Sequence, residues 1–395
     1  MLIGIVGKPS CGKSTFFKAV TLADVAIASY SFTTIKPNRG VGYVRVKCSD
    51  RDLGVQCNPR FGYCKDGTRY VPVELLDVAG LVPGAHEGKG LGNQFLNDLN
   101  QADVLVHIVD ASGMTNERGE ATTGYDPVND VRFLEEEIDL WYLGILKKGW
   151  DKLARTAVQT KEKTEATLVK QMGAFRVTDE HVKDVMHKTR LHEKTIDKWT
   201  EEELKTVATE LRKKTKPILI AANKMDMPDS EKNLERLRDA FPSYTIIACA
   251  ADAELALREA AKRELVEYHP GEGKFETKKQ LNTKQKEALD KIQSLLARFG
   301  STGVQDVLDR AVFDFLKYIA IFPGGIGKLE DSEGRVMPDC FLMPPGTTAY
   351  DFAARIHTDF AKNFLYAMDV RTRQRIGREH ALKHGDVVEI ISAAK

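Results

Sequence analysis

A phosphate-binding motif stands near the start of the chain. Residues 7–14 read Gly-Lys-Pro-Ser-Cys-Gly-Lys-Ser and fit G-x-x-x-x-G-K-[ST], between an apolar segment at 2–6 and a helix-like segment at 15–21. The glycines let consecutive backbone N–H groups face phosphate oxygens. Lys13 is expected to bridge the β- and γ-phosphates, and the Ser14 hydroxyl is expected to bind Mg²⁺. The residues expected to surround the phosphates are Gly7, Lys8, Pro9, Ser10, Cys11, Gly12, Lys13, Ser14 and Thr15.

Two further segments have the chemistry of switches that respond to a γ-phosphate. Asp77 follows an apolar strand expected at 71–76 and opens the pattern D-x-x-G, which ends at Gly80. Asp77 is expected to hold Mg²⁺ through a water molecule, and the Gly80 amide to meet the γ-phosphate. Between the two motifs, Thr33 or Thr34 is expected to close over the metal. The spacing does not choose between these two threonines.

A base-recognition motif follows another apolar strand. Residues 223–226 read Asn-Lys-Met-Asp. One carboxylate, that of Asp226, can accept hydrogen bonds from both N1–H and the N2 amine of guanine, whereas adenine offers no such donor pair. Asn223 is expected to brace the loop, and the aliphatic stem of Lys224 to cover the ring. After the next expected strand, the backbone N–H groups of Ala250 and Ala251 are expected to approach guanine O6, although this chain lacks the usual serine there.

Together these motifs resemble the Obg superfamily of translation-factor GTPases, in particular an archaeal form of its YchF branch, the Obg-like ATPases. The resemblance covers residues 1–395 and is most specific in the glycine-rich segment 80–93. It implies an α/β fold: a P-loop NTPase G domain with an inserted helical coiled-coil arm and a C-terminal β-grasp (TGS) domain. It also implies a nucleotide-dependent switch on the ribosome or ribosomal RNA, with Mg²⁺ as cofactor.

The resemblance also bears on hydrolysis. Leu81 stands where Ras-like proteins carry a water-orienting glutamine, so intrinsic hydrolysis is expected to be slow. His86 and His107 are candidates for the missing group, and the resemblance favours His107. Lys13 and His107 are therefore the two residues expected to be catalytic. A buried, hydrogen-bonded strand histidine is the alternative for His107.

Three alternatives to a GTPase switch remain open. YchF relatives often prefer ATP because their base motif is altered, but here that motif is intact and GTP is expected. An ATP-preferring Obg-like ATPase is therefore the first alternative. A nucleotide-regulated RNA- or ribosome-binding scaffold with incidental hydrolysis is the second. A small-molecule kinase is the third, and it has no need of a guanine-reading motif.

The sequence divides into four predicted parts: a first G-domain part at 1–130, an inserted helical arm at 131–216, a second G-domain part with linking helices at 217–317, and a TGS domain at 318–395. In the arm, one helix is expected over 153–172, and Thr200 and Glu203 form a helix-capping pattern. Residues 147–216 carry 18 Lys+Arg and 12 Asp+Glu, a net charge of +6, so the remainder carries −5. This asymmetry is compatible with RNA contact or with a solvated surface.

Composition favours a cytoplasmic protein. A formal charge of +1 over 395 residues implies no whole-molecule attraction to membrane or nucleic acid. The sequence also does not indicate DNA as a binding partner. No apolar segment approaches the length of a membrane span, and the chain opens on a strand instead of a leader peptide. Six scattered cysteines indicate a reducing compartment. Three of them, Cys48, Cys57 and Cys64, are clustered, but their spacing matches no common zinc motif, so unpaired thiols are favoured over a metal site.

Overall fold

The computed structural model describes residues 1–22, 38–78 and 92–393. Thr33, Thr34, Gly80 and His86 lie outside the described residues, so the roles expected of them stay predictions. The chain separates into two compact units, each made of two segments: Met1–Ala19 with Leu75–Val307, and Val20–Glu74 with Leu308–Lys395. The four domains expected from the sequence divide the chain differently, and their boundaries stay a prediction.

Parallel strands form the centre of the first unit. Strands β1 (Leu2–Val6), β5 (Val104–Asp110), β6 (Ile218–Asn223) and β7 (Ile246–Ala248) lie side by side in that order. The end of β4 (Thr68–Asp77) joins them, because Val78 N–H donates to the Ile5 carbonyl at 3.0 Å. The first three of these parallel strands are continuously buried, as strands covered on both faces are. The loops after them therefore gather at one edge of the sheet, where ligands bind in such folds.

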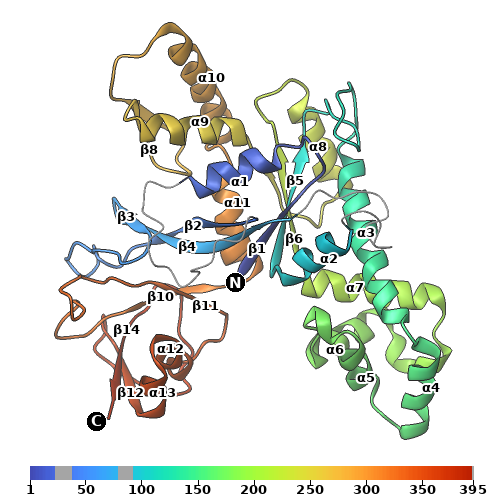
Figure 1. Ribbon diagram of the computed structural model, residues 1–395. Coiled ribbons are helices and arrows are strands. Elements are labelled where there is room, and N and C mark those ends of the chain that lie inside the picture. Colours follow the sequence, from blue (N-terminus) through green and yellow to red (C-terminus); the bar gives the residue numbers. More distant parts are fainter. Residues whose placement is uncertain (23–37, 79–91, 394–395) are drawn as a thin grey trace. The chain divides into compact units, whose positions relative to one another are not determined.

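Helices lie on both sides of this sheet (Figure 1). One group of apolar side chains, including Leu257, Tyr268 and Ile292, joins α9, β8 and α10 into a second small core. The elements of the first unit outside the insertion are α1 (Lys13–Thr21), α2 (Gly92–Gln101), α8 (Ser230–Ala240), α9 (Ala251–Lys262), β8 (Val266–Tyr268), β9 (Phe275–Thr277) and α10 (Thr283–Phe299).

The insertion is helical, as expected. Its helices are α3 (Val128–Lys147), α4 (Trp150–Thr160), α5 (Thr164–Gln171), α6 (Asp179–Thr189) and α7 (Glu201–Thr215). The single helix expected over 153–172 is wrong, because Lys161 adopts a left-handed conformation (φ 56°) that ends α4. The Thr200 capping box is confirmed: its hydroxyl accepts from Glu203 N–H, and the Glu203 carboxylate accepts from Thr200 N–H.

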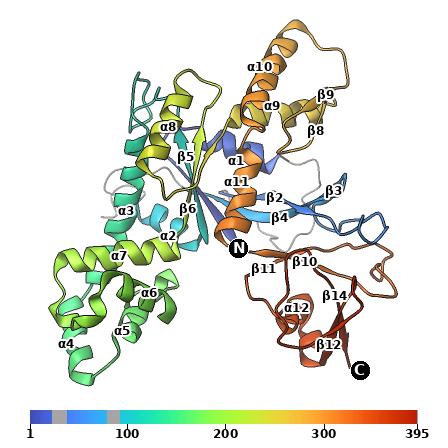
Figure 2. The ribbon, with the colours of Figure 1, turned by 180° about the vertical axis from the view of Figure 1, so that it is seen from behind.

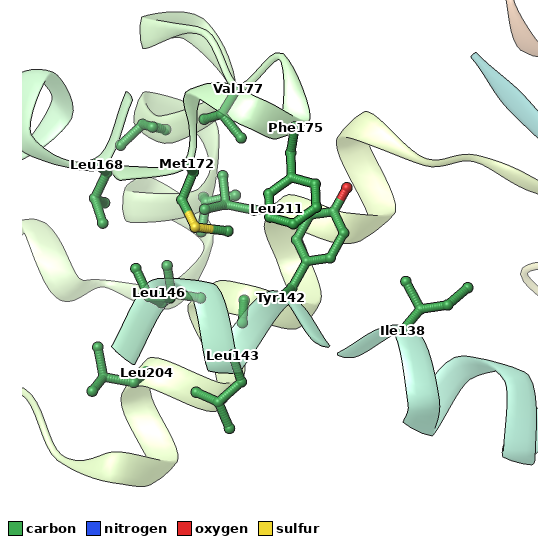
Figure 3. Close-up of a cluster of buried hydrophobic side chains, with 14 of the residues drawn as sticks. Ile138, Tyr142, Leu143, Leu146, Leu168, Met172, Phe175, Val177, Leu204 and Leu211 are labelled. Atoms are coloured by element: carbon green, nitrogen blue, oxygen red, sulfur yellow. The ribbon is translucent and has the colours of Figure 1, made fainter. Parts of the chain in front are cut away.

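Aromatic and aliphatic side chains hold these helices together. The rings of Tyr142 and Phe175 stack with centroids 3.9 Å apart, and Leu146, Met172 and Leu211 pack nearby (Figure 3). The same apolar cluster continues to Leu2 and Val6 of β1. Ordering the insertion thus buries its apolar surface against the sheet that carries the phosphate-binding motif.

A buried arginine of α7 forms ion pairs with α3. Arg212 is only 2% exposed. Its guanidinium donates to Asp139 at 2.8 Å and to Glu135 at 3.1 Å, and also to the Tyr244 hydroxyl at 3.3 Å. Pairing with two carboxylates compensates the cost of burying the charge.

The second unit contains β2 (Arg39–Lys47), β3 (Tyr63–Lys65) and most of β4, with β3 antiparallel to β4. Its C-terminal segment forms a five-stranded sheet in the order β11-β10-β14-β12-β13, with the helix α12 beside it (Figure 2). Ala349 and Phe352 of α12 belong to the apolar core of this sheet. The first helix of this segment ends at Ile356, and the His357 side chain caps a second helix. The remaining elements are α11 (Val304–Arg310), the π-helical turn Ala311–Phe315, β10 (Ile319–Pro323), β11 (Phe341–Met343), α12 (Ala349–Ile356), α13 (Thr358–Lys362), β12 (Phe364–Asp369), β13 (Arg375–Ile376) and β14 (Val387–Ser392).

Within the described part of the chain, no helix combines the length and the apolar character that crossing a bilayer would require.

Candidate functional site

The loop after β1 is preformed as a curved backbone. Ser10 and Gly12 both have positive φ, 61° and 92°. Gly12 is also sterically required, since a Cβ there would lie 2.2 Å from Asn223 Nδ2. Pro9, Ser10 and Ser14 are exposed at the loop surface. A loop held in an unfavourable conformation and open to solvent is typical of a ligand cradle.

Lys13 and Asp77 meet across this loop. The Lys13 ammonium forms an ion pair with the Asp77 carboxylate at the end of β4. Their side chains are 14% and 28% exposed, so neither is sealed from solvent. The sequence assigned Lys13 to the phosphates and Asp77 to the metal. The structure brings the two together, and a triphosphate entering between them would have to exchange this pair.

Asn223 links the phosphate loop to the loop after β7. Its Nδ2 donates to the Cys11 carbonyl at 2.9 Å, and its Oδ1 accepts from Ala251 N–H at 3.0 Å. Asn223 is 2% exposed, so both bonds are protected from water. The bracing role predicted from the sequence thus has a specific geometry: one amide side chain fixes the distance between the two loops.

The amides of Ala250 and Ala251 are already paired. Ala250 N–H donates to the Thr302 carbonyl at 2.9 Å, and Ala251 N–H donates to Asn223 Oδ1. Each would have to exchange an existing hydrogen bond before it could contact guanine O6. The base contact expected of these two amides stays a prediction.

The remaining two residues of the base motif differ in their surroundings. Lys224 has a positive φ of 66°, and its ammonium pairs with Asp110 Oδ2 at 2.8 Å. Asp226 is exposed and lies beside a pocket of about 540 Å³, lined also by Lys291 and Arg298 of α10. The Asp226 carboxylate, which is expected to bind the base, is therefore accessible to a ligand. The Lys224 side chain is held in place by the ion pair between its ammonium and Asp110.

Asp110 is a site residue that the sequence analysis missed. It ends β5 and is fully buried. Burial alone would raise its pKa, but hydrogen bonds from Lys224, Ser112 and Thr115 hold the pKa below its usual value, so it stays ionised. An aspartate at a strand end with a serine two residues later was the available signal, since that pattern favours a local turn.

Lys8 and Cys11 differ from the other predicted phosphate residues. The Lys8 ammonium is buried: it donates to the Thr115 carbonyl at 2.8 Å, pairs with Asp130 at 2.9 Å and lies 4.0 Å from the centre of the Tyr125 ring. Burial raises the pKa of the Cys11 thiol to about 12, so it stays protonated. Both side chains serve to hold the loop. With both side chains buried, a phosphate could contact these two residues only through their backbone N–H groups.

His107 is buried within the sheet. It stands opposite Val6 of β1 and Ile220 of β6, and it is 2% exposed. Burial, together with the nearby Lys8 charge, lowers its pKa to about 3, so the imidazole is neutral near pH 7. Its Nδ1 has no hydrogen-bond partner among the residues the structure describes. A neutral ring can accept a proton or orient a group, but this position does not itself assign catalysis to it.

Because of His107, we expect the free energy of unfolding to fall at acid pH. In the unfolded chain the pKa of this histidine returns to about 6.5. Between pH 6.5 and about pH 3, the unfolded state therefore binds a proton that the folded state does not bind. Stability is fully present above pH 6.5 and falls as the pH drops. At pH 5 we expect a loss of about 2 kcal/mol from this group. His107→Gln should remove that part of the pH dependence in denaturant unfolding.

Two controls accompany this measurement. His380→Gln changes an exposed histidine and should keep the acid sensitivity of the wild type. An imidazole NMR titration reports the ring directly. A His107 resonance that moves near pH 6.5 in the folded protein would contradict the prediction.

The arrangement defines a class of protein. A glycine-rich loop between β1 and α1, an aspartate at the end of β4 and an Asn-Lys-x-Asp motif that begins at the end of β6 all lie at the carboxyl edge of a parallel sheet. This is a P-loop nucleoside triphosphate-binding domain, carried on the same chain as a small C-terminal sheet with helices on one face.

Comparison with known proteins agrees with this class. A family model described as a 50S ribosome-binding GTPase matches residues 2–138, one described as the Obg-like GTPase YGR210-like, G4 motif-containing domain matches residues 221–324, and the TGS domain matches residues 329–392. An uncharacterised GTP-binding protein of Methanocaldococcus jannaschii is 46% identical, with both chains covered completely. Human Obg-like ATPase 1 is 26% identical over 96% of this chain and 86% of its own.

Two solved structures complete the comparison. A GTP-binding protein from Pyrococcus horikoshii OT3 shares 39% identity and a TM-score of 0.77, and the match covers 100% of both chains. The YchF GTPase of Schizosaccharomyces pombe has 20% identity and a TM-score of 0.61, over 99% of this chain and 97% of its own, and it shows the fold alone. The chain belongs to the YchF-type, Obg-like family of GTP-binding proteins.

Proposed function

We propose that this chain is a Mg²⁺-dependent GTPase that hydrolyses the γ-phosphate slowly and acts as a nucleotide-dependent switch on the ribosome or another part of the translation machinery. The observation that carries the proposal is the Asn223 side chain. It joins the phosphate loop, through Cys11, to the loop after β7, through Ala251. A phosphate cradle and a base-reading loop are thereby held at a fixed separation, as one nucleotide with both groups requires.

Guanine as the base is supported by the exposed Asp226 carboxylate. Two donors of guanine match its two oxygens, and adenine has no equivalent pair. The names of several relatives as GTP-binding proteins support the same choice. The name Obg-like ATPase 1, carried by relatives at 26–28% identity, supports the alternative of an ATP-preferring enzyme.

The donors present fit Mg²⁺. This ion prefers oxygen ligands in octahedral geometry and keeps several waters. The Ser14 hydroxyl is exposed and the Asp77 carboxylate is partly exposed, so both offer oxygens next to the phosphate loop. When bound, the ion would neutralise charge on the phosphate oxygens. Lys13 would hold the β- and γ-phosphates. The backbone amides of the loop would hold the phosphate oxygens so that water can attack the γ-phosphorus in line with the leaving group.

A ribosomal partner is supported by two observations. The family model that matches residues 2–138 is described as a 50S ribosome-binding GTPase. Residues 147–216 carry a net charge of +6, which would favour contact with RNA phosphates. A cytoplasmic location belongs to the same proposal.

Phosphate release from GTP and ATP is the direct test. We expect the purified full chain to release phosphate slowly from GTP, more slowly from ATP, and not above background once EDTA removes Mg²⁺. Labelled nucleotides should show tighter binding of GTP than of ATP. Equal or faster turnover of ATP would instead favour the Obg-like ATPase alternative, and phosphate appearing on an added metabolite would favour a kinase.

A further inference from the structure

Three cysteines and one aspartate converge in the second unit, in the part of the chain between the phosphate-binding motif and Asp77. Cys48 follows β2, Asp50 and Cys57 lie in the connection to β3, and Cys64 lies on β3 itself. Their ligand atoms, three sulfurs and one carboxylate oxygen, are all within 4.8 Å of one another. Cys48, Asp50 and Cys57 are 1%, 2% and 6% exposed. The sequence favoured unpaired thiols because eight and six intervening residues fit no zinc knuckle, but the fold brings these residues together.

We propose that Cys48, Asp50, Cys57 and Cys64 form a closed, structural site for one Zn²⁺ ion. Zinc prefers four ligands in a tetrahedron, drawn from thiolates, imidazoles and carboxylates. Four protein ligands leave no open position for a substrate, so the ion would hold the fold and take no part in hydrolysis. Hard cations such as Mg²⁺ select oxygen ligands, so a set with three sulfurs excludes them.

The spacing of the ligand atoms matches this geometry. With Zn–S bonds of about 2.3 Å, two sulfurs at tetrahedral positions lie about 3.8 Å apart. Cys48 Sγ and Cys57 Sγ are 3.6 Å apart. With a Zn–O bond of about 2.0 Å, a sulfur and an oxygen lie about 3.5 Å apart. Cys64 Sγ and Asp50 Oδ2 are 3.8 Å apart.

The surrounding backbone orients the aspartate toward the sulfurs. Asp50 Oδ1 accepts from Arg51 N–H at 2.7 Å, which leaves Oδ2 facing Cys57 and Cys64. Val55 N–H donates to the Asp50 carbonyl at 3.0 Å and closes the turn that carries the carboxylate. A ligand held by an outer hydrogen bond is the usual arrangement around structural metals.

A buried arginine supplies the charge that such a site needs. Three thiolates and one carboxylate around Zn²⁺ carry a net charge of −2. Arg69 is 1% exposed and stands directly opposite Cys64 in the β3–β4 pair, so the two side chains share one face. Its guanidinium donates to the Met337 and Pro338 carbonyls, its Nε has no partner, and it forms no ion pair with any carboxylate in the described ranges. An anionic metal–thiolate group beside it would compensate this buried charge.

The ion would stabilise a contact within the second unit. The loop that carries the ligands also binds the segment before β11: Asn58 N–H donates to the Val336 carbonyl at 2.8 Å, and Arg60 N–H donates to the Pro338 carbonyl at 2.9 Å. Fixing the loop at four points would therefore also fix residues 336–338, at the start of the TGS segment.

Metal content of the purified full chain tests the proposal. The wild type is expressed without a polyhistidine tag and kept reduced. Inductively coupled plasma mass spectrometry should then find about one zinc ion per chain. Cys57→Ser and Cys64→Ser should lose most of it. Cys249→Ala changes a buried cysteine outside the cluster and should keep it. Co²⁺ substitution should give thiolate charge-transfer bands that weaken with each cysteine removed.

A second measurement needs no variant. Mercurial modification of the wild-type thiols should release zinc, which a chromogenic chelator then reports. A chain that holds no zinc after purification and after reconstitution with Zn²⁺ under reducing conditions would overturn the proposal. So would unchanged zinc in Cys57→Ser, or recovery of a Cys48–Cys57 disulfide from alkylated protein.

Discussion

Replacing Asp226 with alanine is expected to weaken GTP binding by about 10²- to 10⁴-fold and to leave ATP binding nearly unchanged. The change removes two charge-assisted hydrogen bonds to the guanine N1–H and N2 amine, each worth about 1.5–3 kcal/mol. Adenine makes neither bond, so its nucleotide has nothing to lose. Titration of labelled GTP and ATP against both proteins gives the four affinities needed.

The conservative variant sharpens this test. Asp226→Asn keeps the shape of the side chain, but its amide can donate to a base oxygen where the carboxylate could only accept. Xanthine carries an oxygen in place of the N2 amine, so Asp226→Asn should bind xanthosine triphosphate better than the wild type does. Asp239→Ala removes an exposed carboxylate of α8 and should bind all three nucleotides as the wild type does. Equal losses for GTP and ATP in Asp226→Ala would contradict guanine reading by this residue.

The phosphate and base motifs could be placed from sequence because parallel strands put their following loops at one edge. The apolar segment at 2–6 and the apolar strand before the base motif were readable from the sequence, and the motif residues follow them directly. The contacts of Asn223 were not readable. Its partners, Cys11 and Ala251, are 212 and 28 residues away, and no local pattern records such pairings.

Elsewhere the sequence failed for identifiable physical reasons. The break at Lys161 has no glycine or proline to mark it, since a lysine occupies the left-handed position. The sequence analysis noted the three clustered cysteines, but it did not predict their convergence with Asp50, because zinc motifs are recognised by pairs of ligands on one tight turn. Here Cys48 follows one strand, Asp50 and Cys57 lie in a loop, and Cys64 lies on a second strand, so no single local pattern indicates that they meet.

Replacing Lys13 with alanine is expected to lower GTP turnover by about 10²- to 10³-fold, the range for removing one group that stabilises charge in the transition state. GTP binding should weaken as well, because the β- and γ-phosphates lose their ammonium. The change also leaves Asp77 without its ion-pair partner. Its carboxylate then repels the incoming triphosphate unless Mg²⁺ lies between them. Phosphate release and nucleotide titration measure the two effects separately.

Lys18→Ala is the matched control. Lys18 lies on the same helix, α1, but its side chain is 61% exposed and pairs with Glu259 at the surface. Exposed pairs of this kind contribute little, so turnover and binding should remain at wild-type levels. A similar loss in Lys18→Ala and Lys13→Ala would mean that the helix, and not the ammonium at the phosphate loop, was disturbed.

The same pair of variants tests the proposed switch. If nucleotide state controls the chain's contact with ribosomes, wild type and Lys18→Ala should sediment with ribosomal particles to different extents with a non-hydrolysable GTP analogue and with GDP. Lys13→Ala should lose that difference, because a ligand can shift an equilibrium only through its differential affinity for the two states. Sedimentation of Lys13→Ala with an unaltered dependence on nucleotide would contradict the switch and favour the scaffold, in which the helical insertion and the TGS segment bind regardless of what the phosphate loop holds.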